Sequence, residues 1–320
     1  MKRPRRIISR ETPKPIDEAQ DYEPPYLELA SSGELARRAQ KLRGMMSDCT
    51  LCAHGCEVDR TGGEIGVCKA GAETVISSAF PHYGEEPPLV GWGGSGTVFL
   101  THCNLRCVFC QNWEISHGGE GHAVSPSGLV EIMVRLQGMG CHNINFVTPT
   151  HFTPQIVEAL GEAAERGLRL PIVWNCGGFE SLEVIRLLEG IVDIYMPDVK
   201  FMADEPARLL TRAKDYPAVV KEVLKEMHRQ VGDLAIGRRG IAYRGLLVRH
   251  LVMPGGIGGT AELVRFLAEE VSPSTYINIM EQYRPCYRAD EFPAISRRPT
   301  HGEFAEALDL AREAGLHRGF

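Results

Sequence analysis

Residues 96–112 read GTVFLTHCNLRCVFCQN, an apolar run that ends in a loop carrying three cysteines. Cys103, Cys107 and Cys110 have the spacing C-x3-C-x2-C. Three thiolates this close together can hold three irons of a [4Fe–4S] cube and leave the fourth iron without a protein ligand. Because such clusters are normally held by four cysteines, the spacing predicts that another molecule binds the open iron.

Two other roles for these cysteines are weaker. A structural zinc site usually combines two C-x2-C pairs, and here only Cys107 and Cys110 form one, so zinc is kept as the alternative. A disulfide framework is typical of small secreted chains, whereas this chain has 320 residues. Its first residues, MKRPRRIISRETPKP, lack the apolar stretch of a signal peptide and are predicted to form a mobile basic arm.

The composition favours an enzyme of the cytoplasm. Apolar residues make up 43% of the chain, and ten cysteines without a secretion signal predict metal binding in a reducing compartment. A formal net charge of −6 argues against a nucleic-acid partner and against a zinc-stabilised nucleic-acid binder. No apolar run approaches the ~20 residues that cross a bilayer, so no membrane association is expected.

From residue 96 onward, β-branched runs alternate with amphipathic segments, which predicts six β/α units in succession. This alternation implies parallel strands, in an open doubly wound sheet or in a partial or full barrel. Active sites of such folds lie at the C-terminal ends of the strands, where the cysteine loop follows the first strand. We expect strands at 97–100, 143–147, 171–174, 191–196, 246–253 and 276–280, a long helical stretch ending near Gly232, and a last helix with a capping box at Thr300 and Glu303.

A second cysteine group precedes this series. Cys49, Cys52, Cys56 and Cys68 have the spacing C-x2-C-x3-C-x11-C, which predicts a second metal centre. Zinc would make this centre structural, and an auxiliary iron–sulfur cluster would make it an electron relay or a substrate anchor. Both metals accept four thiolates, so the spacing leaves both open, and we favour iron–sulfur because the chain already acquires one cluster.

Several long runs resemble one branch of the radical SAM superfamily, the uncharacterised homologues of pyruvate formate-lyase activating enzyme. The runs are CTLCAHGCEVDRTGGEIGVC, PHYGEEPPLVGWGGSGTVFLTHCNLRCVFCQNWEIS, HNINFVTPTHF, DIYMPDVK, RGLLVRHLVMPG and YINIMEQY. The resemblance implies a partial (βα)6 barrel with S-adenosylmethionine (SAM) bound to the open iron. It also implies three parts: a flexible basic arm and leading helix (1–47), a four-cysteine metal-binding module and linker (48–95), and the barrel (96–320).

The resemblance assigns cofactor contacts near the first two strands. Phe109, between the second and third cysteines of the triad, is expected to pack against the adenine. The related enzymes place a Gly-Gly-Glu motif after strand two to orient the methionyl amino group. This chain has Thr148, Thr150 and His151 there, which are expected to replace that contact.

Further contacts are implied at strands three to five. Met196, Asp198 and Lys200 match a Met-x-Asp-x-Lys run that helps the relatives to hold a monovalent cation beside the sulfonium. Asn175 replaces an aspartate of that site, so weaker cation binding is expected. Arg249 is expected to pair with the carboxylate of SAM.

The resulting expectation is a radical SAM enzyme. It would reduce SAM with an electron from an external donor such as flavodoxin or ferredoxin, and the 5′-deoxyadenosyl radical would take a hydrogen atom from an unidentified protein or small molecule. One alternative is an activating enzyme for a glycyl radical protein, and another is a two-cluster electron-transfer protein. The linker 81–88 is expected to cover the barrel mouth.

Overall fold

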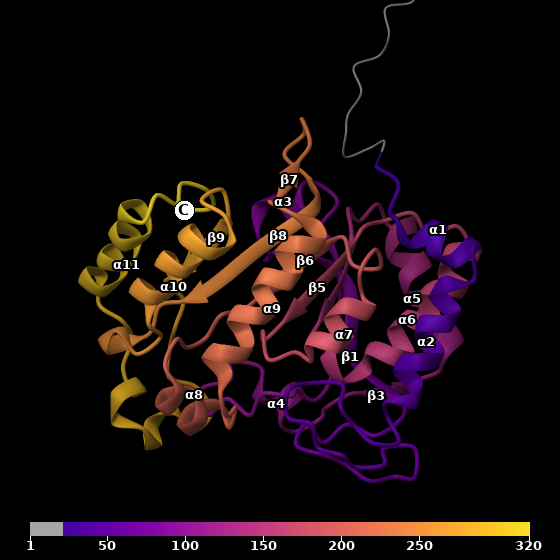
Figure 1. The fold of residues 1–320 in the computed structure, drawn as a ribbon, viewed down its shortest axis with the longest axis horizontal. Coiled ribbons are helices and arrows are strands. Elements are labelled where there is room, and N and C mark those ends of the chain that lie inside the picture. The colour runs from indigo at the N-terminus through magenta and orange to yellow at the C-terminus, as the bar shows by residue number, and fades with distance from the viewer. Residues whose placement is uncertain (1–21) are drawn as a thin grey trace, which may run out of the picture.

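The computed structural model describes residues 22–320, which build one curved sheet of nine strands. Six of these strands are parallel, in the order β2, β4, β5, β6, β8, β9. They are β2 (Ser95–Leu100), β4 (Ile144–Val147), β5 (Ile172–Cys176), β6 (Ile194–Pro197), β8 (Ala242–Leu251) and β9 (Tyr276–Met280). Within residues 22–320 β9 does not pair with β2, so the predicted α/β fold with a six-stranded partial barrel is confirmed (Figure 1).

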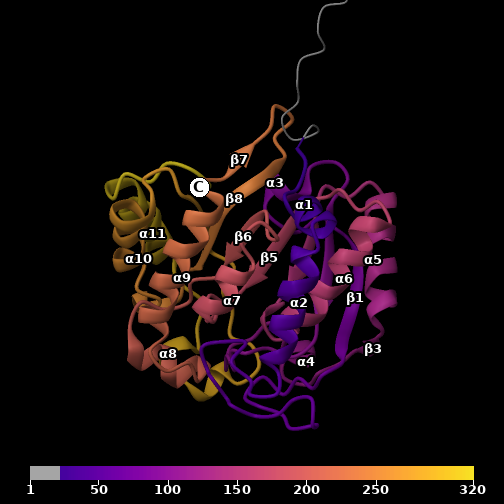
Figure 2. The same cartoon turned by 45° about the vertical axis from the view of Figure 1, so that its right-hand side comes forward.

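Helices cover the outer face of the sheet, as Figure 1 and Figure 2 show from two directions. The predicted capping box at α11 is present: Thr300 Oγ1 accepts from the Glu303 amide at 3.2 Å, and Glu303 Oε2 accepts from the Thr300 amide at 2.7 Å. The helices are α1 (Tyr26–Ser31), α2 (Glu34–Gly44), α3 (Pro87–Val90), α4 (Trp113–Ser116), α5 (Pro126–Gly138), α6 (Thr153–Glu165), α7 (Leu182–Leu187), α8 (Asp204–Thr211), α9 (Tyr216–Val231), α10 (Thr260–Phe266) and α11 (His301–Glu313), with short 3-10 turns at Thr150–Phe152, Pro254–Gly256, Ala289–Glu291 and Pro293–Ile295 and a π-helical turn at Leu267–Val271.

The helical stretch after β6 is divided into α8 and α9 rather than continuous. Arg212 and Asp215 both adopt left-handed backbone conformations, with φ of 60° and 58°, which an α-helix does not contain. The sequence carries one signal for this break, Pro217, which occupies the first turn of α9. As a consequence, the end of α8 is free to contact the cysteine loop.

Three short or edge strands extend the sheet in antiparallel fashion. β1 (Thr74–His82) pairs with β2, β3 (His122–Val124) pairs with β1, and β7 (Ala235–Ile236) pairs with β8. β1 falls within the segment 48–95, which the sequence predicts to be a metal-binding module and linker. That segment therefore also supplies part of the barrel wall.

The chain after β1 enters the N-terminal end of the barrel, beside β7 in Figure 1. Its short helix α3 buries Leu89 against Val173, Ile194 and Leu247, which point into the barrel from three strands. The expectation that residues 81–88 cover the barrel mouth holds only in part, because His82, Gly84 and Glu85 line the cavity whereas Pro87 and Pro88 lie in α3. Apolar burial of Leu89 draws the segment to the opposite end, and only its first part reaches the cavity at the C-terminal end.

The N-terminal helices lie on the outside of the barrel. α1 and α2 pack against α6, and the Tyr22 hydroxyl donates to Asp193 Oδ1 at 2.6 Å, next to the start of β6. The predicted leading helix is thus a pair of helices, whereas the predicted basic arm lies in residues 1–21, outside the described part. None of the helices between residues 22 and 320 is long and apolar enough to cross a membrane.

We predict that Gly245→Ala destabilises the barrel. Gly245 has φ of +124°, and a Cβ there would lie 2.4 Å from the Asp233 carbonyl oxygen and from Leu234 Cα. Strain and overpacking of this kind cost about 1–3 kcal/mol each, so a lower melting temperature is expected in anaerobic thermal denaturation. Gly138→Ala is the control, because its helical position has open space around the new methyl group and an equal or higher melting temperature is expected. Equal melting temperatures for both variants would contradict this account.

Candidate functional site

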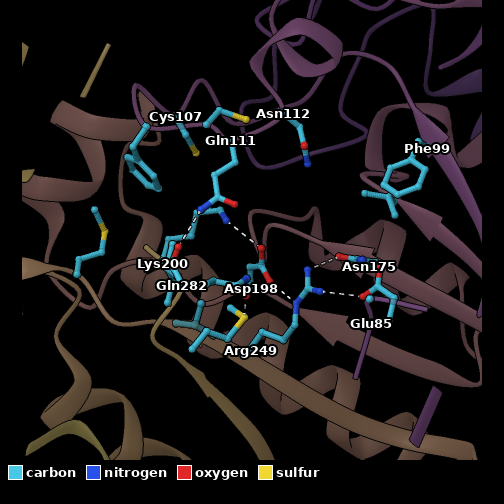
Figure 3. A pocket seen from close by; sticks show the side chains of 18 of the residues that line it. Glu85, Phe99, Cys107, Gln111, Asn112, Asn175, Asp198, Lys200, Arg249 and Gln282 are labelled. Carbon is cyan, nitrogen blue, oxygen red and sulfur yellow. Dashed lines mark hydrogen bonds and ion pairs between the residues drawn. The ribbon is translucent and has the colours of Figure 1, made fainter. Parts of the chain in front are cut away.

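A cavity of about 390 Å³ opens at the C-terminal ends of the parallel strands (Figure 3). Its walls come from three sources: the inward-facing residues at the ends of the strands, the cysteine loop after β2, and the chain that follows β1. The lining residues are His82, Gly84, Glu85, Phe99, Cys107, Phe109, Cys110, Gln111, Asn112, Val147, Asn175, Asp198, Val199, Lys200, Arg249, Leu251, Met253, Met280 and Gln282.

Arg249 of β8 is the centre of the polar wall. Its Nε donates to Asp198 Oδ1 at 2.6 Å, its Nη1 to Glu85 Oε2 at 3.1 Å and its Nη2 to Asn175 Oδ1 at 2.8 Å (Figure 3). Lys200 Nζ donates to the other oxygen of Asp198 at 3.1 Å. One guanidinium therefore joins the ends of β5, β6 and β8 to the chain that follows β1.

The charges of this wall are closely balanced. Burial alone would raise the pKa of Asp198, but Arg249 and Lys200 outweigh it and hold that pKa at about 2. Burial raises the pKa of Glu85 to about 7 against the opposing effect of Arg249, and the neighbouring Glu86 raises it further. Of the two carboxyl groups bound to Arg249, Glu85 is therefore the one whose pKa lies near neutral pH.

These contacts change two expectations drawn from the resemblance. Arg249 does not offer an unpaired guanidinium to the carboxylate of a ligand, because its Nε, Nη1 and Nη2 each already donate to a protein oxygen. Asn175 Oδ1 and Asp198 Oδ1 both accept from Arg249, so a monovalent cation bound to these oxygens would lie beside the guanidinium. The guanidinium supplies the positive charge at this place.

The cysteine loop presents its sulfurs to one side of the cavity. Cys107 and Cys110 line the cavity, and burial raises the pKa of the Cys103 thiol, to which both neighbouring thiols add. The Leu105 amide donates to Cys103 Sγ at 3.3 Å, and burial raises the pKa of Cys107 to about 12 against the charge of Lys200. Hydrogen bonds from the backbone amide and the positive charge of Lys200 favour the thiolate form of these cysteines over the neutral thiol.

No group of three or more His, Cys, Asp or Glu side chains between residues 22 and 320 is arranged as a closed metal site. The donor chemistry of the loop nevertheless fits an iron–sulfur cluster: of three clustered thiols, Cys107 and Cys110 line a cavity large enough for a further ligand, and Cys103 has an amide donor to its sulfur. The loop is held on both sides, because the Val108 amide donates to Leu210 O at 2.9 Å and the Arg288 amide donates to Val108 O at 2.9 Å.

Phe109 lies where a residue that contacts a cavity ligand should lie. It lines the cavity and is buried between Phe201 and Tyr283, whose rings approach its own edge-on at 6.0 and 6.1 Å. This packing fixes the orientation of the ring. Its neighbour Gln111 also lines the cavity and donates from Nε2 to Gln282 O at 3.4 Å.

The cavity is not lined by four residues that the resemblance placed at the cofactor: Thr148, Thr150, His151 and Met196. The backbone turns at Thr148, with φ of +59°, and this turn carries Thr150 and His151 away into a buried 3-10 turn. There Thr150 Oγ1 donates to Glu180 Oε1 and His151 Nε2 to Thr101 O, both at 2.8 Å. Met196 points into the barrel one layer below Asp198 and packs in the core around Leu89. The structure places these four residues outside the cavity lining.

The wall opposite the cysteine loop includes Glu85, His82 and Phe99. Sequence reasoning gave none of the three a binding role, although it expected the linker 81–88 at the barrel mouth. A signal for Phe99 was present, because it occupies the last inward-facing position of its strand, as Asn175 does. Glu85 has no comparable signal. Its place depends on how the chain after β1 passes into the barrel, which the local sequence does not specify.

The second cysteine group docks on the cysteine loop. His54 Nε2 donates to Asn104 O at 2.8 Å, and Cys52 forms an isolated β-bridge with Glu180. Burial raises the pKa of the Cys68 thiol, and Cys49 and Cys56 add to this effect, so these sulfurs lie close together. Figure 1 shows the segment between α2 and β1 at the end of the molecule toward which β8 points.

Comparison with known proteins identifies the domain. The model of the Radical SAM superfamily matches residues 97–241. The chain is 31% identical over 297 residues to the uncharacterised protein MJ0674 of Methanocaldococcus jannaschii, covering 91% of this chain and 82% of that protein. It is 24% identical over 300 residues to the uncharacterised protein MJ0808 of the same organism, covering 88% of this chain and 81% of that protein.

A solved structure of Streptococcus suis SuiB bound to the precursor peptide SuiA resembles the chain with a TM-score of 0.47 and 11% identity. The match covers 68% of this chain and 46% of SuiB, so the chain spans less than half the length of that protein.

We predict that Glu85 contributes to the pH dependence of stability. Because burial raises its pKa from about 4.5 to about 7, its contribution is complete below pH 4.5 and is lost as the pH rises through 7. The melting temperature of Glu85→Gln relative to the wild type should therefore increase between pH 5 and pH 8. The slope of the wild type itself has contributions of both signs, because burial also raises the pKa of Glu180 and of Asp193 to about 7 and lowers the pKa of His117 and of His151. The exposed Glu313→Gln control should keep the wild-type slope, and an unchanged slope in Glu85→Gln would contradict the assignment.

Proposed function

Since the chain belongs to the radical SAM superfamily, we propose that its cavity binds SAM beside a [4Fe–4S] cluster held by Cys103, Cys107 and Cys110. The observation that carries this proposal is the position of the loop. Two of its three thiols, those of Cys107 and Cys110, line the cavity at the C-terminal ends of six parallel strands, where such folds place their chemistry. The superfamily domain supports SAM-dependent radical chemistry by an iron–sulfur enzyme.

When bound, the cluster supplies the electron that cleaves SAM to methionine and a 5′-deoxyadenosyl radical, which takes a hydrogen atom from the substrate. The chain's own residues position the reactants. Phe109 offers a fixed ring face to the adenine. Lys200 has two ammonium donors beyond its bond to Asp198, and these suit the carboxylate of SAM in place of Arg249. Lys200 also stabilises the Cys107 thiolate.

Arg249 and Asn175 have a positioning role in this proposal. The guanidinium neutralises Asp198 and Glu85 and keeps the wall rigid, because breaking a buried ion pair leaves an uncompensated charge. The apolar side chains of Phe99, Val147 and Met280 keep much of the remaining wall dry, which limits side reactions of a carbon radical. We assign the wall of Glu85, His82 and Phe99 to the substrate, since it faces the cysteine loop across the cavity.

We also propose that Cys49, Cys52, Cys56 and Cys68 bind a second metal. Support comes from Arg60, whose side chain is 1% exposed and donates from Nη1 toward Cys49 Sγ at 3.9 Å. None of the ion pairs found between residues 22 and 320 includes Arg60. A buried cation without a carboxylate partner is costly unless another negative charge compensates it, and four thiolates bound to a divalent metal or a cluster supply that charge.

Two hydrogen bonds from backbone amides to cysteine sulfurs add support for the second metal centre. The Ala70 amide donates to Cys68 Sγ at 3.5 Å, and the His54 amide donates to Cys52. Each donor lies two residues after its cysteine, as Leu105 does after Cys103 in the triad. The same local geometry at both groups suggests the same kind of ligand, so we favour an iron–sulfur cluster over zinc.

The first test is reductive cleavage of SAM. Anaerobic protein, reconstituted with iron and sulfide and reduced with dithionite, should form 5′-deoxyadenosine. Cys107→Ser should form none above background and should lose the cluster absorbance, because three thiolates are needed to hold the cube. Cys141→Ser is the matched control, since Cys141 is buried in the core away from the cavity and should keep both signals. A wild-type protein with an intact cluster and no 5′-deoxyadenosine would disprove the proposal.

The second centre is tested by metal content. Cys49→Ser should lower the bound metal per chain without abolishing the cluster absorbance of the triad, whereas Cys286→Ser should leave the metal content unchanged. Arg60→Met should weaken retention of the second metal on dialysis against a chelator, because the compensating charge is removed. Iron and sulfide found in excess of one cube would identify a cluster, and zinc would identify a structural site. Equal metal content in Cys49→Ser and the wild type would refute the second centre.

A further inference from the structure

An exposed aromatic face lies beside the cluster ligand Cys110. It consists of Trp113 on α4, His117 after α4, and Tyr287, which is distant in sequence. The rings of Trp113 and Tyr287 stack at 5.4 Å with planes 13° apart, and the His117 ring meets Tyr287 edge-on at 4.8 Å. Trp113 is 39% exposed and Tyr287 is 42% exposed. Large aromatic side chains held together at a surface are typical of sites that bind a partner.

The aromatic face is connected to the cluster ligand through direct contacts. Cys110 Sγ lies 3.1 Å from Ser116 Oγ, and Ser116 Oγ lies 2.9 Å from His117 Nδ1. The His117 ring in turn contacts Tyr287. A continuous series of contacts therefore leads from the surface to a sulfur of the triad.

The aromatic face is separate from the cavity. Gln111 and Asn112 line the cavity, whereas Trp113 and Tyr287 do not. A molecule bound to the aromatic face would therefore approach the cluster from the outside, while SAM and substrate occupy the inside. This arrangement suits a partner that delivers electrons and takes no part in the hydrogen abstraction.

The charge around the aromatic face is positive. Burial lowers the pKa of His117 to about 4, and Arg106 and Arg212 lower it further, so both cations lie near the ring. Arg106 Nη1 also donates to Ser116 O at 3.2 Å. Neither arginine takes part in any of the ion pairs found in the described part of the chain. Uncompensated cations on a chain with a net charge of −6 favour an acidic partner at this place, although Glu114 on α4 contributes one negative charge.

We propose that the aromatic face, with Arg106 and Arg212, is the docking surface for an acidic one-electron carrier protein. The inference rests on the proposed function, because it supplies the electron which that function requires. One electron passes from the reduced centre of the carrier to the cluster held by the triad. The carrier is oxidised by one electron, the cluster is reduced by one, and no bond or proton is exchanged.

The test compares two electron donors on the same holoenzyme. Dithionite is small and needs no docking surface, whereas reduced flavodoxin is acidic and must dock. In the double variant Trp113→Ala/Tyr287→Ala, we expect formation of 5′-deoxyadenosine with flavodoxin to fall at least about tenfold, because a few buried aromatic side chains carry most of the binding energy of an interface. The rate with dithionite should stay at the wild-type level. Arg212→Glu should also slow the flavodoxin reaction, most strongly at low ionic strength.

Trp92→Ala is the matched control. Trp92 is 60% exposed, but it follows α3 at the opposite end of the barrel, so both donors should act on this variant as on the wild type. The proposal is overturned if the double variant loses activity equally with both donors, which would indicate local damage, or keeps full activity with flavodoxin. Failure of the wild type with dithionite would instead disprove the proposed function itself.

Discussion

The ion pairs and hydrogen bonds of Arg249 hold the functional end of this molecule together. One guanidinium binds Asp198, Glu85 and Asn175, which come from three different parts of the chain. Removing one partner of a buried pair typically costs about 3–5 kcal/mol, because the remaining charge is left without compensation. The partial barrel has no closed ring of strand pairing at this edge, so side chains must supply the coupling that the backbone does not. The same network fixes the position of Lys200 relative to the cysteine loop.

The sequence predicted the features that depend on local pattern. Six parallel strands and the cysteine loop after the first of them follow from periodicity and spacing, and the structure has both. The capping box at Thr300 is likewise a local signal. Phe109, Asn175, Asp198, Lys200 and Arg249 lie at the cavity because each is close to the end of a strand or the cysteine loop, and strand ends meet at one edge of a parallel sheet.

Features that depend on the path of the backbone were not predictable. A single left-handed residue, Thr148, turns the chain so that Thr150 and His151 are buried against Glu180 and Thr101 instead of facing the cavity. Glu85 reaches the cavity because Leu89, four residues later, is buried at the other end of the barrel. In each case a tertiary contact decides the outcome, and the local sequence does not describe it.

The short strand β3 has a consequence for the protein before it acquires metal. β3 (His122–Val124) is an outermost strand of the sheet, only three residues long and partly exposed. Long free strand edges pair with other chains and lead to aggregation, whereas a short polar edge offers few backbone groups for such pairing. Within residues 22–320, β3 pairs only with residues 74–76 of β1, so this protection covers one end of that strand, and residues 77–82 keep an edge at which the newly made chain, with its thiols still unliganded, can pair with another chain.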